Sequence, residues 1–451
     1  MTLLNRSEQE KLQIELRALF DSLWPIHRSI TGEGYRKSLE ILSQWMPMKI
    51  MRSLSGKKIF DWVVPEEWSI DEAYLIDPEG NRFADIKENN LHIVAYSCAF
   101  KGELPLSELK KHLHTRADLP DAIPYVTSYY KKTWGFCIKY SQYRKLKKGV
   151  YKVFIKSSFK KGFVEAGESY IKGRSKKEIL LTSYLCHPSM ANNELSGPLV
   201  LACLYRLLQM RPIDKSECGV RIVLHPETIG ALCFIYNKRK TLARRVVGGS
   251  VVSCVGLNEN LKLKRARNKG SDFERVLKKL VIEQDGLVTD FTPFGSDERQ
   301  YCSPGINLPV CLLSRANNFT YREYHTSMDN KNVMHFGNII KTAETLYKAI
   351  ELTGKNQKLT NKITCGEPFF TRHNLYPTTS AGNAIRHGLD KKQEAYVWIM
   401  SLCDGEKDLI TIAENSGLEI ATVIQASKDL LMSGLLRKSS VSQNSGKRFP
   451  K

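Results

Sequence analysis

Hydrophobic and polar positions follow several successive patterns along this chain of 451 residues. Apolar residues recur at helical spacing over residues 1–54, which predicts N-terminal helices packed on a larger domain. Short β-branched and aromatic runs separated by turn residues fill residues 55–175 and predict a β-rich subdomain. Strand-like apolar runs alternate with helical segments over residues 176–370, whereas residues 371–440 hold three helical stretches. The polar residues 441–451 are expected to form a disordered tail.

The segment 176–370 is expected to form an α/β domain around a mostly parallel sheet. Its strand-like runs, such as EILLTSYL and VRIVLHP, are apolar almost without interruption, as in strands buried on both faces. Helical segments between these runs are typical of a sheet covered by helices on both sides. Ligands of such sheets bind beyond the carboxyl ends of the strands, so the residues that follow each run are the first candidates for chemistry.

The segment 371–440 has the outline of a small winged-helix module. Its helical stretches are broken at Asp404-Gly405 and Ser416-Gly417. Over residues 371–451 there are 11 Lys and Arg and 8 Asp and Glu, so only 11 − 8 = +3 of the net charge lies there. Because phosphate neutralisation needs several cations, specific DNA binding is the less favoured interpretation of this module. The apolar pattern of the last helix fits packing or homo-oligomer formation better.

Composition sets further limits on the kind of protein. A content of 42% hydrophobic and 25% charged residues is ordinary for a globular chain. The amphipathic N-terminal segment lacks the apolar stretch of a signal peptide, and no apolar window of about 18 residues predicts a membrane span. The eleven cysteines include no CxxC pair, which indicates a reducing, cytoplasmic compartment and argues against a cysteine zinc site.

The net charge of +21 is spread over the whole chain. Solvated surface charge is the simpler interpretation of this excess. The alternative is an anionic partner, such as a sugar nucleotide, an acidic glycan or a nucleic acid.

Metal-capable side chains cluster after the first strand-like run of the α/β segment. His187 follows the run ILLTSYL, and Asn192, Asn193 and Glu194 lie in the turn before Ser196-Gly197. A lone histidine at a strand end is more often structural, but the oxygen-rich turn beside it favours a metal site. A zinc hydrolase needs imidazole and carboxylate ligands, an open position for water, and a separate carboxylate that accepts a proton from that water.

Other candidate residues follow later strands. Glu227 follows VRIVLHP, where burial would raise its pKa toward the range of a general base; the alternative is a glutamate that complements a helix dipole. Asp297 lies in the loop FGSDE, and Tyr324 and His325 follow the run LPVCLLS. Two histidines and several carboxylates are therefore expected at one edge of the sheet, which core packing does not explain.

The order of these motifs resembles that of the M28-type zinc aminopeptidases. More closely, the chain resembles the DUF4910 group of bacterial aminopeptidase-like proteins, whose members often occur with polysaccharide-biosynthesis functions. The resemblance covers about residues 15–350 and rests on DWVVPEEW, CHPSMANNELSGP, HPETIGA, FGSDERQYCSPG and EYHTSMDN. It implies an M28-like three-layer sandwich with an all-β insert and a winged-helix module after it.

The resemblance assigns the two histidine ligand positions to His187 and His325 and the general base to Glu227. Asn193 stands where a bridging aspartate is expected, and a neutral amide cannot bridge two divalent ions as a carboxylate does. Thr228 stands where a ligand glutamate is expected. Near the third-ligand aspartate the chain offers only Ser253 and Cys254.

We therefore expect at most one zinc ion, held by His187, His325 or both. Asn193, Glu194 or Glu227 and water would complete its coordination, and the sequence leaves open whether Glu227 is ligand or base. Asp297 is expected to orient a substrate amine or a histidine ligand. Tyr324 is expected to donate a hydrogen bond to a developing oxyanion.

The expected function is that of a cytoplasmic zinc-dependent aminopeptidase or amidohydrolase. Its substrate would be a small amide or peptide, with an acylated or aminoacylated sugar as one candidate. The alternative is a degenerate peptidase fold that binds a ligand without turnover, since carboxylates are absent at positions 193, 228 and 253. A winged-helix DNA-binding regulator is a third and weaker hypothesis.

Overall fold

The structure is a computed structural model that describes residues 3–213, 217–316, 321–376 and 390–439. The chain divides into two compact units, Met1–Lys348 and Ala349–Lys451, each of which is described by itself. The tail predicted over residues 441–451 lies outside the described residues. None of the described helices is long and apolar enough to cross a membrane.

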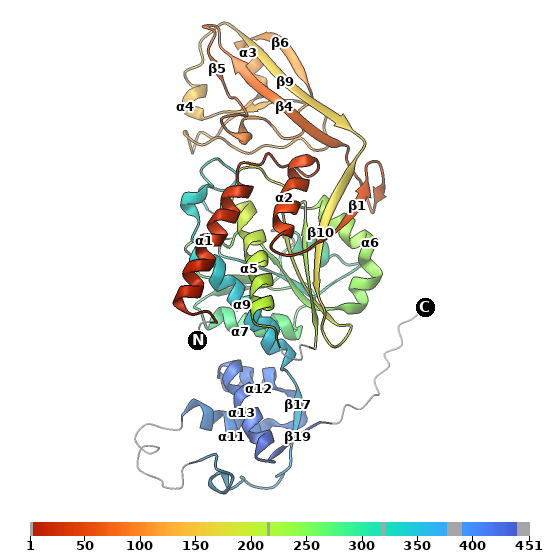
Figure 1. Cartoon of the computed structure of the whole chain (residues 1–451), viewed down its shortest axis with the longest axis vertical. Helices are drawn as coiled ribbons and strands as arrows, with labels where there is room; N and C mark the ends of the chain where they lie inside the picture. Colours follow the sequence, from red (N-terminus) through yellow and green to blue (C-terminus); the bar gives the residue numbers. More distant parts are fainter. Residues whose placement is uncertain (1–2, 214–216, 317–320, 377–389, 440–451) are drawn as a thin grey trace. The chain divides into compact units, whose positions relative to one another are not determined.

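The first unit is built on an eight-stranded mixed sheet (Figure 1). Parallel pairing joins the four central strands, which agrees with their uninterrupted apolar sequences. Three other pairs of neighbouring strands are antiparallel: β1 with β10, β10 with β12, and β16 with β14. The strands, in sheet order, are β1 (Lys49–Leu54), β10 (Phe163–Ile171), β12 (Gly219–His225), β11 (Glu178–Tyr184), β13 (Val246–Val252), β16 (Val310–Ser314), β14 (Lys262–Lys264) and β15 (Leu287–Thr289).

Helices pack against this sheet in a layered α/β arrangement. Helix α5 contacts β11 and β13, α6 contacts β10 and β12, and α7 contacts β13. Helix α1 packs on α5, and α1 buries Leu12, Leu16, Leu19, Phe20 and Leu23 at the predicted helical spacing. The helices are α1 (Arg6–Leu23), α2 (Glu33–Ser43), α5 (Ser196–Met210), α6 (Ile229–Arg245), α7 (Asp272–Ile282), α8 (Glu298–Tyr301) and α9 (Phe336–Gly354).

A β-rich subdomain is inserted between β1 and β10. Its four-stranded sheet has the order β5 (Arg82–Phe83), β4 (Glu67–Ile76), β9 (Val150–Lys160) and β6 (Phe100–Pro105). Two small pairs are β2 (Lys58–Ile59) with β3 (Trp62–Val63) and β7 (Leu113–His114) with β8 (Phe136–Cys137); α3 (Leu106–Leu109) and α4 (Tyr140–Tyr143) complete the subdomain. The sequence pattern extended this subdomain to residue 175, whereas β10 pairs with β1 and β12 in the large sheet.

In its described residues, the second unit combines several helices with a three-stranded antiparallel sheet. It comprises β17 (Lys358–Asn361), α11 (Lys391–Leu402), β18 (Asp404–Asp408), α12 (Leu409–Ser416), α13 (Ile420–Met432) and β19 (Leu436–Lys438). Gly417 and Gly434 follow α12 and α13 with φ of 73° and 75°, where glycine is the favoured residue. The sequence pattern placed the start of this module at residue 371, but β17 pairs with β18 and β19, so the sheet includes residues 358–361.

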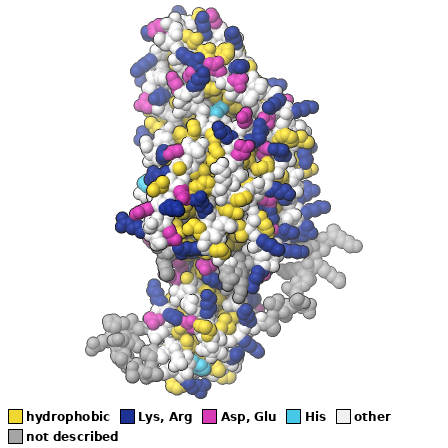
Figure 2. Space-filling view, in the orientation of Figure 1, with side chains coloured by type: hydrophobic (Ala, Val, Ile, Leu, Met, Phe, Trp, Pro, Cys, Tyr) yellow, Lys and Arg dark blue, Asp and Glu magenta, His cyan; other side chains and the backbone are white. Residues whose placement is uncertain are grey.

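Basic side chains are spread over the visible face of the molecule and are mixed with acidic ones (Figure 2). Many basic side chains of the described residues form exposed ion pairs, such as Lys111 with Glu108 and Arg174 with Glu217. This distribution supports the interpretation of the net charge as solvated surface charge.

Candidate active site

The candidate site lies beyond the carboxyl ends of two adjacent parallel strands. Tyr184, the last residue of β11, pairs with His225, the last residue of β12. His187 and Glu227 follow these ends closely, so the sheet brings them together as the sequence pattern predicts. The distance between Nε2 of His187 and Oε2 of Glu227 is 3.7 Å.

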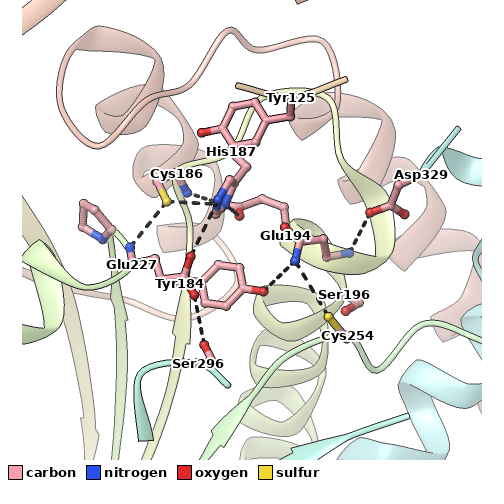
Figure 3. A network of polar contacts seen from close by, with 12 residues as sticks. Tyr125, Tyr184, Cys186, His187, Glu194, Ser196, Glu227, Cys254, Ser296 and Asp329 are labelled. Carbon is pink, nitrogen blue, oxygen red and sulfur yellow. Dashed lines mark hydrogen bonds and ion pairs between the residues drawn. The ribbon is translucent and has the colours of Figure 1, made fainter. Parts of the chain in front are cut away.

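Glu194 reaches His187 because the chain between them folds back in a turn of π-helix, Ala191–Leu195. Its Oε2 lies 2.5 Å from Nδ1 of His187, and its Oε1 accepts a hydrogen bond from the backbone N–H of Cys186 (Figure 3). Both side chains are buried. The carboxylate thereby fixes the orientation of the imidazole ring and leaves Nε2 of His187 directed at Glu227.

His325 approaches the same place from a loop that follows β16. Its ring centroid is 5.3 Å from that of His187. Its Nε2 is buried and has no hydrogen-bond partner among the described residues. Burial, followed by the charge of His187, lowers the pKa of His325 to about 3, so the ring is neutral and can act as a ligand.

Tyr125 of the β-rich subdomain packs against both histidines. Its ring centroid is 4.9 Å from His187 and 5.4 Å from His325. The N–H of Tyr125 donates to the carbonyl of His325 at 2.8 Å, and the N–H of Ser327 donates to Ile123. The inserted subdomain therefore helps to hold the His325 loop, which the sequence pattern did not indicate.

Glu227 stands at a strained turn between β12 and α6. Thr228, the next residue, has φ of 59°, which is unusual for a β-branched residue. Oε1 of Glu227 accepts a hydrogen bond of 3.4 Å from the Ser296 hydroxyl. Burial raises the pKa of Glu227, although the nearby His187 opposes the shift, and a raised pKa suits a general base.

The carboxylate of Asp297 supports this turn through a hydrogen bond. Its Oδ1 accepts a hydrogen bond of 2.8 Å from the N–H of Thr228, and its Oδ2 lies 3.7 Å from Nδ1 of His225. Burial and then the charge of Glu227 raise the pKa of Asp297 well above its usual value. Its described contacts are thus with the Glu227 turn and His225, and none is with His187 or His325.

Asn193 is held by contacts on three sides. Its N–H donates to Oδ2 of Asp329 at 2.9 Å, while its Nδ2 donates to the Tyr184 hydroxyl at 3.0 Å and to Sγ of Cys254 at 3.8 Å. The N–H of Asn192 donates to the other oxygen of Asp329 at 2.8 Å. These bonds leave Oδ1 of Asn193 buried without a partner among the described residues.

Tyr324 stacks on His325, with ring centroids 3.9 Å apart and planes inclined by 11°. Its backbone carbonyl accepts a hydrogen bond from Arg116 of the β-rich subdomain. Burial raises the pKa of the Tyr324 hydroxyl, which therefore remains protonated and able to donate a hydrogen bond.

Several buried atoms around this site could serve as ligands of a divalent metal ion. Nε2 of His325 and Oδ1 of Asn193 are buried polar atoms without partners among the described residues, and such atoms are rare unless a ligand satisfies them. Sγ of Cys186, His187 and Glu194 also offer atoms within 4.8 Å of one another. A thiol was not expected near the site, but burial raises the pKa of Cys186 to about 11, which disfavours the thiolate that a metal requires.

A cavity of about 260 Å³ opens beside these residues. Cys186, His187, Glu227 and Thr228 are among the residues that line it. Ile30, Trp62, Tyr129, Tyr130 and Ile229 complete its lining. The sequence pattern had not singled out these aromatic residues, whose only signal is an aromatic cluster in IPYVTSYY and DWVVPEEW.

Comparison with known proteins identifies relatives over nearly the whole chain. A family model described as a domain of unknown function (DUF4910) matches residues 17–356, and a winged helix-turn-helix model matches residues 357–438. A Clostridium acetobutylicum protein, whose name proposes a polysaccharide biosynthesis protein with an aminopeptidase-like domain, is 36% identical over 425 residues. That alignment covers 94% of this chain and 96% of the relative.

Solved structures give the same picture of the fold. A proposed peptidase from Clostridium acetobutylicum superposes with a TM-score of 0.85 at 34% identity, covering 96% of this chain and 98% of that chain. BSAP, a zinc aminopeptidase from Bacillus subtilis, superposes with a TM-score of 0.53 at 14% identity, covering 74% and 94%. The first unit therefore has the fold of the M28-type zinc peptidases, followed by a winged-helix unit. The chain belongs to the DUF4910 family.

Proposed function

We propose that this protein is a metal-dependent amide hydrolase that acts on a small amide or peptide. The observation that carries the proposal is that His187 lies close to both Glu227 and His325, and that burial raises the pKa of Glu227, which lines the same cavity as His187. The likeness in fold to zinc aminopeptidases supports the same reaction class. The name of the Clostridium relative supports a role in polysaccharide biosynthesis.

One zinc ion would be held by Nε2 of His187, Nε2 of His325 and Oδ1 of Asn193. Zinc, when bound, supplies Lewis-acid activation of water and of an amide carbonyl. Glu194 then orients His187 through Nδ1, as carboxylates commonly do for ligating histidines, instead of serving as a ligand itself. Position 228 is a threonine and position 253 a serine, so the carboxylates that would hold a second ion are absent.

Glu227 accepts a proton from the attacking water and returns it to the leaving amine. Asp297 holds the turn that carries Glu227 by accepting the N–H of Thr228. Tyr324 donates a hydrogen bond to the carbonyl oxygen as negative charge develops there.

We place the protein in the cytoplasm, since no disulfide links the cysteines of the described residues.

A second candidate function is ligand binding without turnover. Asn193 favours it, because an amide is a weaker metal ligand than a carboxylate. The two functions differ in whether Glu227 acts as a general base in a hydrolysis reaction.

The test is to compare the wild type with Glu227→Gln, using zinc-loaded protein and a panel of aminoacyl anilides and N-acetylated amino sugars. We expect the wild type to hydrolyse members of the panel and Glu227→Gln to lower kcat by about 100-fold or more, with zinc retained. Glu217→Gln, an exposed carboxylate of another ion pair, is the matched control. Unchanged turnover in Glu227→Gln would exclude Glu227 as the base, and no turnover by zinc-loaded wild type would favour the binding function.

A further inference from the structure

Two aromatic side chains of the β-rich subdomain form an exposed corner in the wall of the active-site cavity. Trp62 and Tyr130 line the same cavity as His187 and Glu227. Their ring centroids are 5.4 Å apart and their planes are inclined by 67°, an edge-to-face contact. Trp62 is 38% exposed and Tyr130 is 54% exposed, so core packing does not account for either ring.

The hairpin that carries Trp62 is fixed to the domain that carries Glu227. Ile59, which pairs with Trp62 across the hairpin, is fully buried. The ring of Phe60 lies 5.4 Å from that of Tyr236 on α6, and Nζ of Lys57 lies 5.0 Å above the same Tyr236 ring. Because α6 begins just after Glu227, the position of Trp62 relative to the candidate base is set by packing.

Tyr130 follows Tyr129, whose hydroxyl group is fixed by Tyr125. The hydroxyl groups of Tyr129 and Tyr125 are 2.6 Å apart, and Tyr125 packs against His187 and His325. The aromatic wall is therefore connected to both histidines, and a ligand against it would lie beside them.

Polar groups lie next to this aromatic corner. A second cavity, of about 290 Å³, shares Tyr129 and Tyr130 with the first and is also lined by Glu66, Lys131 and Lys132. An exposed aromatic face bordered by hydroxyl, carboxylate and ammonium groups suits a sugar ring, which has an apolar face and a polar edge. An apolar side chain would instead favour a dry and closed pocket.

We propose that Trp62 and Tyr130 bind the sugar ring of an amide-bearing amino sugar, whose amide then lies beside Glu227. This inference rests on the proposed function and names its substrate class. In the reaction, one water is consumed, the amide C–N bond breaks, the acyl carbon leaves as a carboxylic acid, and the proton taken up by Glu227 goes to the amine of the sugar.

The test measures binding of N-acetylglucosamine and N-acetylgalactosamine to the zinc-loaded full chain by ligand-observed NMR and calorimetry. The variants are Trp62→Ala, Trp62→Phe and Tyr130→Ala, and Phe294→Ala removes a 73% exposed aromatic side chain outside both cavities. We expect Trp62→Ala and Tyr130→Ala to weaken binding by about tenfold, Trp62→Phe to retain most of it, and Phe294→Ala to leave it unchanged. Zinc content and thermal unfolding should stay the same throughout.

Binding is measured on Glu227→Gln as well, which separates this inference from the proposed function. Sugar binding by Glu227→Gln that depends on Trp62 supports the aromatic corner even if no hydrolysis is found. Two results overturn the inference: sugar affinity that is unchanged in Trp62→Ala, or a Trp62-dependent affinity for N-acetylphenylalaninamide without any for the sugars.

Discussion

At the residue scale, Glu194 is the side chain whose role depends most on the folded structure. Its carboxylate touches Nδ1 of His187 and the N–H of Cys186. We expect Glu194→Ala to lower zinc affinity roughly 10- to 100-fold, because His187 loses the group that orients it. Competition with a chromophoric chelator measures this affinity. Glu274→Ala, which removes another buried carboxylate, is the control, and equal affinity in Glu194→Ala would refute the orienting role.

Asn193 offers a gain-of-function prediction. Its Oδ1 is buried without a partner among the described residues, so Asn193→Asp places a negative charge where a metal ligand is proposed. Without metal, a buried unpaired charge is unfavourable, and we expect the variant to unfold at a lower temperature than the wild type. With zinc we expect a larger rise in Tm than in the wild type, by linkage. Differential scanning fluorimetry with and without zinc measures both, and an equal rise in the two proteins would contradict a ligand at position 193.

The sequence predicted the site residues unequally. His187 and Glu227 were identifiable because each follows an apolar strand, and strand ends of parallel sheets meet at one edge. Glu194 was identifiable only as an acidic neighbour, because its contact with His187 depends on the π-helical turn at Ala191–Leu195. Tyr125 could not be singled out from the aromatic segment IPYVTSYY, since its approach to the histidines depends on tertiary packing of the inserted subdomain.

At the element scale, the turn from β12 to α6 stores backbone strain beside the candidate base. Thr228 has φ of 59°, and its N–H is held by Asp297. Glycine adopts this region without steric cost. We therefore expect Thr228→Gly to be more stable than Thr228→Ala by about 1 kcal/mol. Urea unfolding of the two variants measures the difference, and a less stable Thr228→Gly would show that the turn is not strained.

Glu178 begins β11, at the opposite end of this strand from the site. Its carboxylate receives two hydrogen bonds of 2.8 Å from Arg221 and one of 3.2 Å from Arg245, and it is fully buried. Glu178→Ala leaves buried guanidinium N–H groups without their acceptor, although Arg221 keeps its ion pair with Glu168, so the variant should lose about 2 kcal/mol of stability. We expect zinc affinity to remain unchanged at a temperature where the variant is folded.

The control for this prediction is Glu217→Ala, which breaks the exposed pair with Arg174. Its loss should stay below about 1 kcal/mol, because water screens exposed charges. Equal losses of stability in Glu178→Ala and Glu217→Ala would show that burial of the Glu178 network has no energetic consequence.

The arrangement of the strands was predicted at the centre of the sheet better than at its edges. The apolar runs of β11, β12, β13 and β16 indicated parallel strands, and these four pair in parallel. The antiparallel strands β1 and β10 flank the inserted subdomain, and their separation in sequence hid their pairing. The strands β14 and β15 have three residues each, too few for a periodic pattern to be recognised.

At the scale of the whole molecule, the chain joins a peptidase-like unit to a winged-helix unit. The last helix of that second unit, α13, carries Lys428, whereas its Asp429 accepts hydrogen bonds from Tyr396 and Gln425. These charges do not suggest a surface that contacts DNA phosphates. The proposed hydrolase chemistry belongs to the first unit, and weak or absent DNA binding by the second unit stays a prediction.

The central claim is that His187 and His325 hold one metal ion. The most direct measurement is the zinc content of dialysed wild type, His187→Ala and His325→Ala, with the exposed His335→Ala as control, by plasma mass spectrometry. We predict about one zinc ion per chain in the wild type and in His335→Ala, and almost none in the other two. Stoichiometric zinc in both His187→Ala and His325→Ala would contradict the account.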